Sequence, residues 1–538
     1  MALNLMRAWL GVVLAAAALA SASAAGADGL VNSRRAPVNA VHSPRDARSL
    51  AAEIDAALAA QWAEAKIIPV AVADDGEFLR RASLDIVGKI PTAAEARDFL
   101  DDPSKNKRIT LIERLLDSPA YTTRTTELWR KLLLPEADTD DQARQFAGTF
   151  EAWLRRKVIE EAGYDRIVRE ILTAKLARAN PNANAVATQL EPSPAAYYLA
   201  KENKPENLAG GVARVFLGIR LECAQCHNHP FADWKREQFW SFAAFFAEIA
   251  QPDPENPAVV TPRPRDGLPL RELTIPGTKK TVSATHLDGS SPAWRPRADN
   301  REILAEWVTS RDNRYFARAV VNRVWARFFG VGLIEPVDDL AEEKGSEFDG
   351  LLDELAYQFR AHDYNLKYLI RALTTTQAYG LASIANPGAS AAPLFSSMPV
   401  RGLSAGQLFD SLTQATGSDG NESRGRFLEL FANREERAVE AQTTIVQALT
   451  MMNGTYVEAA TNPGTGQVLG AVVMAPFLDT PGRIESLYLA SLTRRPTPEE
   501  LSLLVRFVER RKSPEDQEKA VADIFWAILN GPEFPLNH

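Results

Sequence analysis

Apolar residues recur at helical spacing along most of the chain, and this periodicity restricts the fold more than any other feature. Clear apolar stripes run through residues 109–116, 153–159 and 167–172. Other apolar runs follow helix-start signals. Thr92 with Glu95, and Thr497 with Glu500, are spaced like capping boxes. The pattern therefore predicts a mainly α fold in which these stripes form the core.

The length of 538 residues favours more than one domain. Prolines are dense between residues 251 and 298, where short β-like runs at 272–275 and 281–283 interrupt the helical pattern. We therefore predict two helical domains joined by a small β-containing, Pro-rich connecting segment. The predicted boundaries are a signal peptide at 1–24, a flexible leader at 25–45, a first helical domain at 46–250, the connecting segment at 251–298 and a second helical domain at 299–535.

The first residues are typical of an export signal. Arg7 precedes an apolar stretch from Ala8 to Leu19, and small residues follow in the A-x-A-like pattern of a cleavage site. The alternative, a retained membrane anchor, is less favoured because the stretch is short. We expect an exported protein, located in the periplasm, at the cell surface or outside the cell, with no membrane span after signal cleavage.

The two cysteines of the chain lie three residues apart in Cys223-Ala224-Gln225-Cys226-His227. In this C-x-x-C-H spacing, the two thiols can bind the vinyl groups of a haem while the histidine ligates its iron. With two cysteines and six histidines in the chain, a random arrangement gives the motif on the order of once in 20,000 cases. Cys223, Cys226 and His227 are therefore the candidate haem c site, and export agrees with it.

Aromatic residues follow the motif closely and suggest one wall of a haem pocket, although an ordinary aromatic core is the alternative. A sixth iron ligand has to come from elsewhere, because His229 is too near His227 to reach the opposite face. The aromatic residues are Phe231, Trp234, Phe239, Trp240, Phe242, Phe245 and Phe246, and the chemically able ligands are His286, His362, Met398, Met451, Met452 and Met474.

Two other interpretations use the same residues. Cys223, Cys226, His227 and His229 could hold zinc, although four ligands within seven residues are tight for a closed tetrahedral site. Alternatively, the two cysteines could form a disulfide after export, or remain free thiols. In either case the protein would be a non-redox secreted interaction or scaffold protein.

Other chemistries receive little support. The sequence lacks the G-x-S-x-G, H-E-x-x-H, Walker A and G-x-G-x-x-G motifs. Asp338 and Asp339 follow Pro336 in a carboxylate-rich stretch, which leaves a hydrolase of envelope or environmental polymers as a weaker alternative to a solvated loop. The net charge of −8 argues against nucleic acid as the main partner.

Several longer stretches resemble the planctomycete cytochrome-like secreted protein family, whose N-terminal cytochrome-like domain and C-terminal partner domain both lack an assigned function. The similar stretches are 78–92 (FLRRASLDIVGKIPT), 115–121 (LLDSPAY), 215–231 around the C-x-x-C-H motif, 304–310, 316–325, 332–339 and 492–497. The resemblance implies an exported protein with a haem-associated first domain. Members often carry a further cytochrome c module, but this sequence contains no second C-x-x-C-H.

These observations together favour an exported haem c protein that transfers electrons to a redox partner not identified by the sequence. Whether it is also an enzyme, and its oligomeric state, stay open.

Overall fold

The computed structural model describes residues 43–176, 191–249, 269–340, 346–384, 393–418, 424–431 and 455–538. The predicted signal peptide, nearly all of the predicted leader, residues 251–268 of the connecting segment, and Met451 and Met452 lie outside the described residues.

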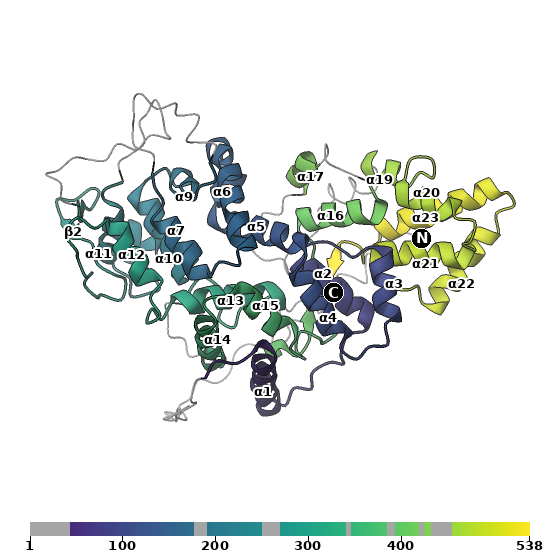
Figure 1. The fold of residues 1–538 in the computed structure, drawn as a ribbon, viewed down its shortest axis with the longest axis horizontal. Coiled ribbons are helices and arrows are strands. Elements are labelled where there is room, and N and C mark those ends of the chain that lie inside the picture. Colours follow the sequence, from purple (N-terminus) through teal and green to yellow (C-terminus); the bar gives the residue numbers. More distant parts are fainter. Residues whose placement is uncertain are drawn as a thin grey trace, which may run out of the picture. The chain divides into compact units, whose positions relative to one another are not determined.

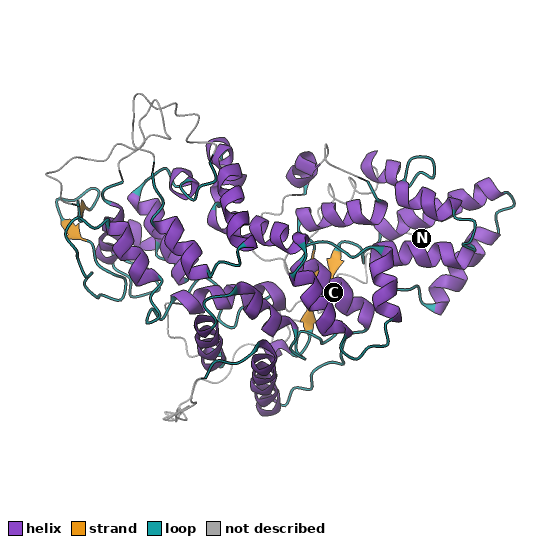
Figure 2. Cartoon of the chain, in the orientation of Figure 1, coloured by secondary structure: helices purple, strands orange, loops and turns teal. Residues whose placement is uncertain are grey.

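The fold is mainly α, as predicted, with 21 α-helices in the described residues and a few short strands (Figure 1, Figure 2). Up to residue 246 the helices, with short 3₁₀ helices labelled η, are α1 (Ala47–Ala65), α2 (Asp75–Ile86), α3 (Ala93–Asp101), α4 (Lys107–Leu116), α5 (Pro119–Leu133), η1 (Pro135–Asp138), α6 (Asp141–Ile159), α7 (Tyr164–Leu172), α9 (Ala196–Ala200), α10 (Pro205–Leu217), η2 (Glu222–Gln225), α11 (Arg236–Ala243) and η3 (Ala244–Phe246). After residue 299 they are α12 (Asn300–Val308), α13 (Phe316–Phe329), α14 (Asp349–Ala361), α15 (Leu366–Thr374), η4 (Pro393–Phe395), α16 (Ala405–Thr416), α17 (Arg424–Leu430), α19 (Thr455–Ala460), α20 (Gln467–Met474), α21 (Thr480–Leu492), α22 (Pro498–Glu509) and α23 (Pro514–Leu529).

The strands occur as three small pairs. In the connecting segment, β1 (Glu272–Thr274) and β2 (Thr281–Ser283) form an antiparallel hairpin at the two β-like runs of the sequence. The other two pairs lie outside the connecting segment. They are β3 (Ser383–Ile384) with β4 (Met398–Pro399), parallel, and β5 (Arg401–Gly402) with β6 (Leu536–Asn537), antiparallel.

Capping residues fix where many helices begin. Thr92 and Thr497 form the capping boxes that their spacing predicts, and Asp299 caps α12. The first helix begins after Asp46, which is its cap and accepts a hydrogen bond from the Ser49 amide at 2.8 Å.

The stripes do form the core, in two apolar clusters. The larger cluster takes buried residues from both sides of the connecting segment, from Ala47 to Met398. The smaller one lies mainly among α16 and α19–α23, with Leu84 of α2 and Ile90 packed against it. Residues 44–538 make one compact unit, and the division into two domains at 251–298 stays a prediction.

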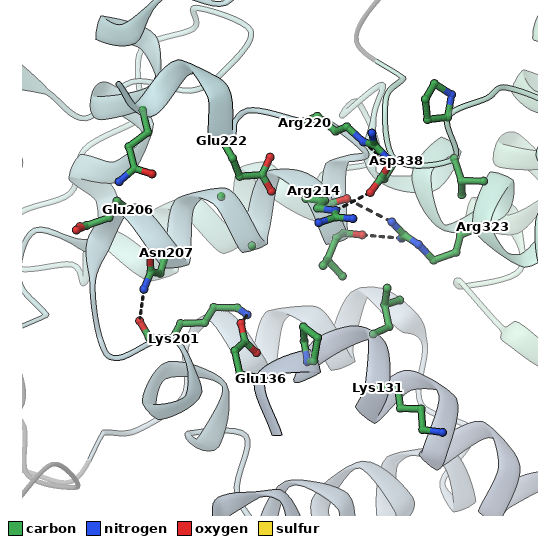
Figure 3. Close-up of a pocket in the computed structure, with 18 of the residues that line it drawn as sticks. Lys131, Glu136, Lys201, Glu206, Asn207, Arg214, Arg220, Glu222, Arg323 and Asp338 are labelled. Atoms are coloured by element: carbon green, nitrogen blue, oxygen red, sulfur yellow. Dashed lines mark hydrogen bonds and ion pairs between the residues drawn. The ribbon is translucent and has the colours of Figure 1, made fainter. Parts of the chain in front are cut away.

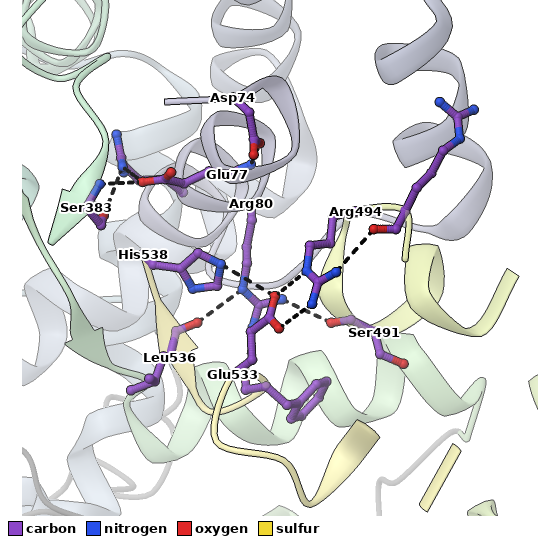
Figure 4. Close-up of polar contacts among 12 residues, drawn as sticks. Asp74, Glu77, Arg80, Ser383, Ser491, Arg494, Glu533, Leu536 and His538 are labelled. Carbon is purple, nitrogen blue, oxygen red and sulfur yellow. Dashed lines mark hydrogen bonds and ion pairs between the residues drawn. The ribbon is translucent and has the colours of Figure 1, made fainter. Parts of the chain in front are cut away.

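Helix α2 carries charged side chains into this core. Arg80 is fully buried and donates to the backbone oxygens of Leu536, Ser491 and Phe534 at 3.1, 3.0 and 2.6 Å (Figure 4). Arg81, also buried, donates to the carbonyl oxygens of Tyr379 and Leu381. Because these acceptors lie 298 to 456 residues along the chain, α2 is held in place by segments far away in the sequence.

Asp85, one turn further along α2, binds three more distant residues. Both oxygens of its carboxylate accept from Arg401 Nη2 at 2.8 Å. The carboxylate also accepts from Tyr379 Oη at 2.9 Å and from Asn537 Nδ2 at 2.8 Å. Asp85 and Arg401 are both buried. The buried ion pair with Arg401 joins α2 to β5, and the hydrogen bond from Asn537 joins α2 to β6.

Candidate functional site

The C-x-x-C-H motif lies on a short turn that a helix end sets up. Helix α10 stops at Gly218, which adopts the left-handed conformation at φ 64° that glycine tolerates best. The amide of Ile219 then bonds back to the Ala213 carbonyl at 3.0 Å. Ile219 and Leu221 are fully buried and fix the chain just before the motif.

The motif begins within the 3₁₀ turn η2 (Glu222–Gln225), and Cys226 follows directly as its C-cap. This geometry sorts the side chains of residues 221–226 onto three faces. A 3₁₀ helix has three residues per turn, so residues three apart lie on the same side. Leu221 and Ala224 face the core, while Cys223 and Cys226 are both exposed and are free thiols. The two sulfurs are thus presented to solvent from one side of the turn.

The two histidines of the motif region have different surroundings. His227 is exposed, and its Nδ1 lies 2.7 Å from the carbonyl oxygen of Asn228. If Nδ1 donates there, Nε2 keeps a lone pair directed away from the backbone. His229 instead uses Nδ1 as an acceptor for the amides of Phe231 and Ala232 at 3.3 and 2.9 Å, so it holds the loop together.

The segment after the motif is tied back to it. Arg236 donates through its amide to Asn228 Oδ1 at 3.0 Å and through Nε to the Gln225 carbonyl at 3.2 Å. Trp240 Nε1 donates to the same carbonyl at 3.0 Å. The turn is therefore anchored on α11 although its thiols are exposed.

Most of the aromatic residues after the motif lie in the core, as the alternative interpretation of an ordinary aromatic core expects. Phe239, Trp240, Phe242, Phe245 and Phe246 are buried in the larger apolar cluster, where Phe242 and Phe245 pack against residues such as Trp307 and Trp294. The helix turns its apolar face to the core because core packing buries more surface than an open wall. Phe231, in contrast, is 87% exposed.

Four of the candidate sixth ligands lie in the described residues. Three of them are buried or stacked on aromatic rings, and Met474 is exposed. His286 is stacked between Phe245 and Trp307, with ring centroids 5.3 and 4.7 Å away. His362 stacks on Tyr368 at 3.6 Å, and Met398 is buried. Met474 is exposed at 76%.

The zinc interpretation finds no assembled ligand set. Within the part of the chain that the structure describes, no three His, Cys, Asp or Glu side chains come together as a metal-binding group. Cys223, Cys226, His227 and His229 therefore do not converge on one point in this conformation.

A charged cavity of about 960 Å³ adjoins the other face of the turn, where Glu222 and Gln225 line it (Figure 3). Lys201 is buried in its wall and pairs with Glu136 at 2.8 Å. Because Cys223 and Cys226 lie on a different face of η2, this cavity is distinct from the surface that the thiols face.

Asp338 lies in the same cavity, and the expectation of a solvated loop carboxylate is wrong for it. It is 9% exposed and accepts from Arg214 Nε at 2.6 Å and Arg220 Nε at 2.7 Å. Burial raises the pKa of Asp338, but the hydrogen bonds from the two arginines outweigh burial and bring the pKa below its usual range. Asp338 is therefore held ionised between two guanidinium groups.

The described helices include none that is both long and apolar enough to cross a membrane.

Comparison with known proteins gives two family matches. Residues 53–251 match the family described as Protein of unknown function (DUF1549), named PSCyt2, and residues 300–441 match Protein of unknown function (DUF1553), named PSD1. No curated protein and no solved structure matched the chain. Two regions of the chain thus match the DUF1549 and DUF1553 models, in the order that the sequence resemblance predicts.

Proposed function

We propose that the protein is exported, binds haem covalently through Cys223 and Cys226 with His227 as the iron ligand, and transfers electrons. The observation that carries the proposal is the arrangement of the 3₁₀ turn, which presents both free thiols to solvent on one side. Haem attachment needs two accessible sulfurs at this spacing.

The surroundings of His227 support its role as the ligand. Metal-bound histidines usually donate their other ring N–H to a carbonyl or carboxylate, which fixes the tautomer. The contact of His227 Nδ1 with the Asn228 carbonyl supplies that arrangement and leaves Nε2 for the iron. His229 lacks it, since its Nδ1 accepts backbone hydrogen bonds.

The protein's own contribution is to hold these groups in place. Leu221 and Ala224 anchor the turn in the core, while Arg236 and Trp240 fix the Gln225 carbonyl. When bound, haem supplies a one-electron redox centre. A centre bound at this exposed turn would lie near the molecular surface, which suits exchange of electrons with another protein.

The full chain expressed with a haem-maturation system tests the proposal. We expect a c-type pyridine haemochrome band and a mass increase of one haem on the peptide that contains residues 223–227. Cys223→Ser with Cys226→Ser should abolish both signals. His229→Ala is the matched control, since it should retain the covalent haem, while His227→Ala should lose the native iron coordination seen in the visible spectrum.

An unmodified peptide from matured wild-type protein would contradict the haem proposal. Zinc without iron in elemental analysis of the same sample would favour the non-redox scaffold interpretation instead.

A further inference from the structure

A second cavity, of about 510 Å³, is lined by residues of α5, α13 and the segment around β5. It is separate from the cysteine turn, because none of residues 222–227 lines it. It combines basic side chains with an apolar wall. Five basic and two acidic side chains line it, namely Arg124, Lys131, Arg323, Arg327 and Arg401 with Asp85 and Glu335.

The two acidic groups do not balance the buried guanidinium groups. Asp85 is already occupied by Arg401, Tyr379 and Asn537. Glu127, outside the lining, pairs with Arg124 at 3.3 Å and with Lys131 at 3.1 Å.

The hydrogen bonds that Arg327 and Arg323 make within the described residues go to backbone oxygens. Arg327 Nη2 donates to the Asp85 carbonyl at 2.7 Å, and Arg323 donates to the carbonyls of Val215 and Arg214 at 2.8 and 3.3 Å. Among the described residues, neither arginine has a carboxylate partner within ion-pair distance.

Two further donors in the cavity wall lack a partner. The Nε atoms of Arg124 and Arg401 are buried and make no hydrogen bond in the described structure. Both side chains are more than nine-tenths buried. A buried guanidinium with an unused N–H is costly unless a ligand satisfies it.

The pKa values of the arginines agree with this shortage of acidic partners. Burial, together with the like charge of Arg124, lowers the pKa of Arg327 to about 9. Burial also lowers the pKa values of Arg323 and Arg124. The cavity thus concentrates positive charge on partly or fully buried guanidinium groups, where an anion is attracted more strongly than in open water.

The apolar part of the cavity wall indicates what kind of molecule the anionic group belongs to. Leu128, Trp129, Leu132, Val324, Leu366 and Ile370 line the cavity beside the arginines. Apolar surface of this kind binds an apolar ligand body, whereas guanidinium groups bind carboxylate, phosphate or sulfate through paired hydrogen bonds.

We propose that this cavity is a binding site for an organic anion, with one oxyanion group held by Arg327, Arg124 and Arg401 and an apolar body against α5 and α15. The site is independent of haem attachment and uses none of its residues.

Calorimetric titration of the full chain with phenyl phosphate, phenyl sulfate and 4-phenylbutyrate tests the site, with 4-phenylbutan-1-ol as the neutral counterpart and inorganic phosphate as the anion without an apolar body. We expect at least one aromatic anion to bind about tenfold or more tightly than the neutral alcohol and than inorganic phosphate. The preferred head group identifies the class of oxyanion.

Arg327→Met should weaken binding of that anion about tenfold or more, and Arg327→Lys should weaken it less. The melting temperature of the free Arg327→Met protein should stay the same or rise, because the substitution removes a partly buried charge without a carboxylate partner. Arg318→Met is the matched control on the same helix, since Arg318 pairs with Asp349 outside the cavity, and it should leave binding unchanged.

Hydrogen exchange of the wild-type protein provides a test that needs no variant. The bound anion should slow exchange in α5 and α13. Equal binding of the neutral alcohol, unchanged affinity in Arg327→Met, or no protection of α5 and α13 in the presence of saturating anion would each overturn the proposal.

Discussion

Replacing Asp85 by asparagine tests whether the buried charge on α2 holds the distant segments of the chain together. The side chains of Asp85 and Arg401 are 4% and 8% exposed, so water screens this pair little. Asparagine would leave Arg401 without a counter-charge and place an amide donor among the groups that now donate to Asp85. Removing one partner of such a pair costs about 3–5 kcal/mol.

This loss is a large part of the stability of an ordinary protein, which is about 5–15 kcal/mol. Urea unfolding followed by circular dichroism should therefore show a much lower midpoint with an unchanged slope. Asp363→Asn is the control. Asp363 also pairs with an arginine, Arg311 at 3.2 Å, but its side chain is 87% exposed, so its removal should cost about 0.5 kcal/mol or less.

A double variant separates the ion pair from simple loss of packing. Asp85→Asn with Arg401→Met removes both charges and should lose less stability than the two single variants added together. A loss below about 1 kcal/mol in Asp85→Asn, or additive losses in the double variant, would refute the reasoning.

Three other predictions follow from individual contacts. Gly211→Ala should destabilise the protein by about 1–3 kcal/mol in urea unfolding, because a Cβ there would lie 2.6 Å from Lys201 Cε and 3.0 Å from Tyr197 Oη; Gly148→Ala, in open space on α6, should be neutral or stabilising. Burial and the charge of Arg80 lower the pKa of His538 to about 4, so the unfolded chain binds more protons between pH 6.5 and 4 and stability should fall as the pH drops through this window; His538→Gln should reduce that dependence in thermal melts. Asp338→Asn should lower the melting temperature more than Asp339→Asn, since only Asp338 bridges Arg214 and Arg220, and full retention of any hydrolytic activity in both variants would remove the hydrolase alternative.

Local features of the sequence predicted most of the helices. The predicted stripes at 109–116 and 167–172 lie in α4 and α7, and the capping boxes at Thr92 and Thr497 form as their spacing indicates. These predictions succeed because periodicity and caps depend on residues within a few positions of one another.

Features that depend on distant partners were not predictable. Nothing near Arg80 in the sequence indicates that its acceptors lie more than 400 residues away, and charged residues are usually exposed. The same holds for the cavity arginines and for Asp338, whose partners come from other helices.

The candidate site was predictable only in its composition. The sequence identified Cys223, Cys226 and His227, but the direction of the aromatic residues around 239–246 depends on which side of α11 meets the core. Only the three-dimensional structure distinguishes the hydrogen-bonding roles of His227 and His229.

The contacts of α2 have a practical consequence for dissecting the chain. A fragment cut at the end of the DUF1549 match would retain Arg80, Arg81 and Asp85 but lose every backbone oxygen and side chain beyond residue 376 that they bind. Arg80 and Asp85 would then lose the partners of their side chains, and Arg81 would keep only its ion pair with Glu77, so charged groups would lie in an apolar interior with much of their bonding capacity unused. Family boundaries and cooperative folding units therefore differ here, and fragments designed from the former are expected to be insoluble or to expose α2.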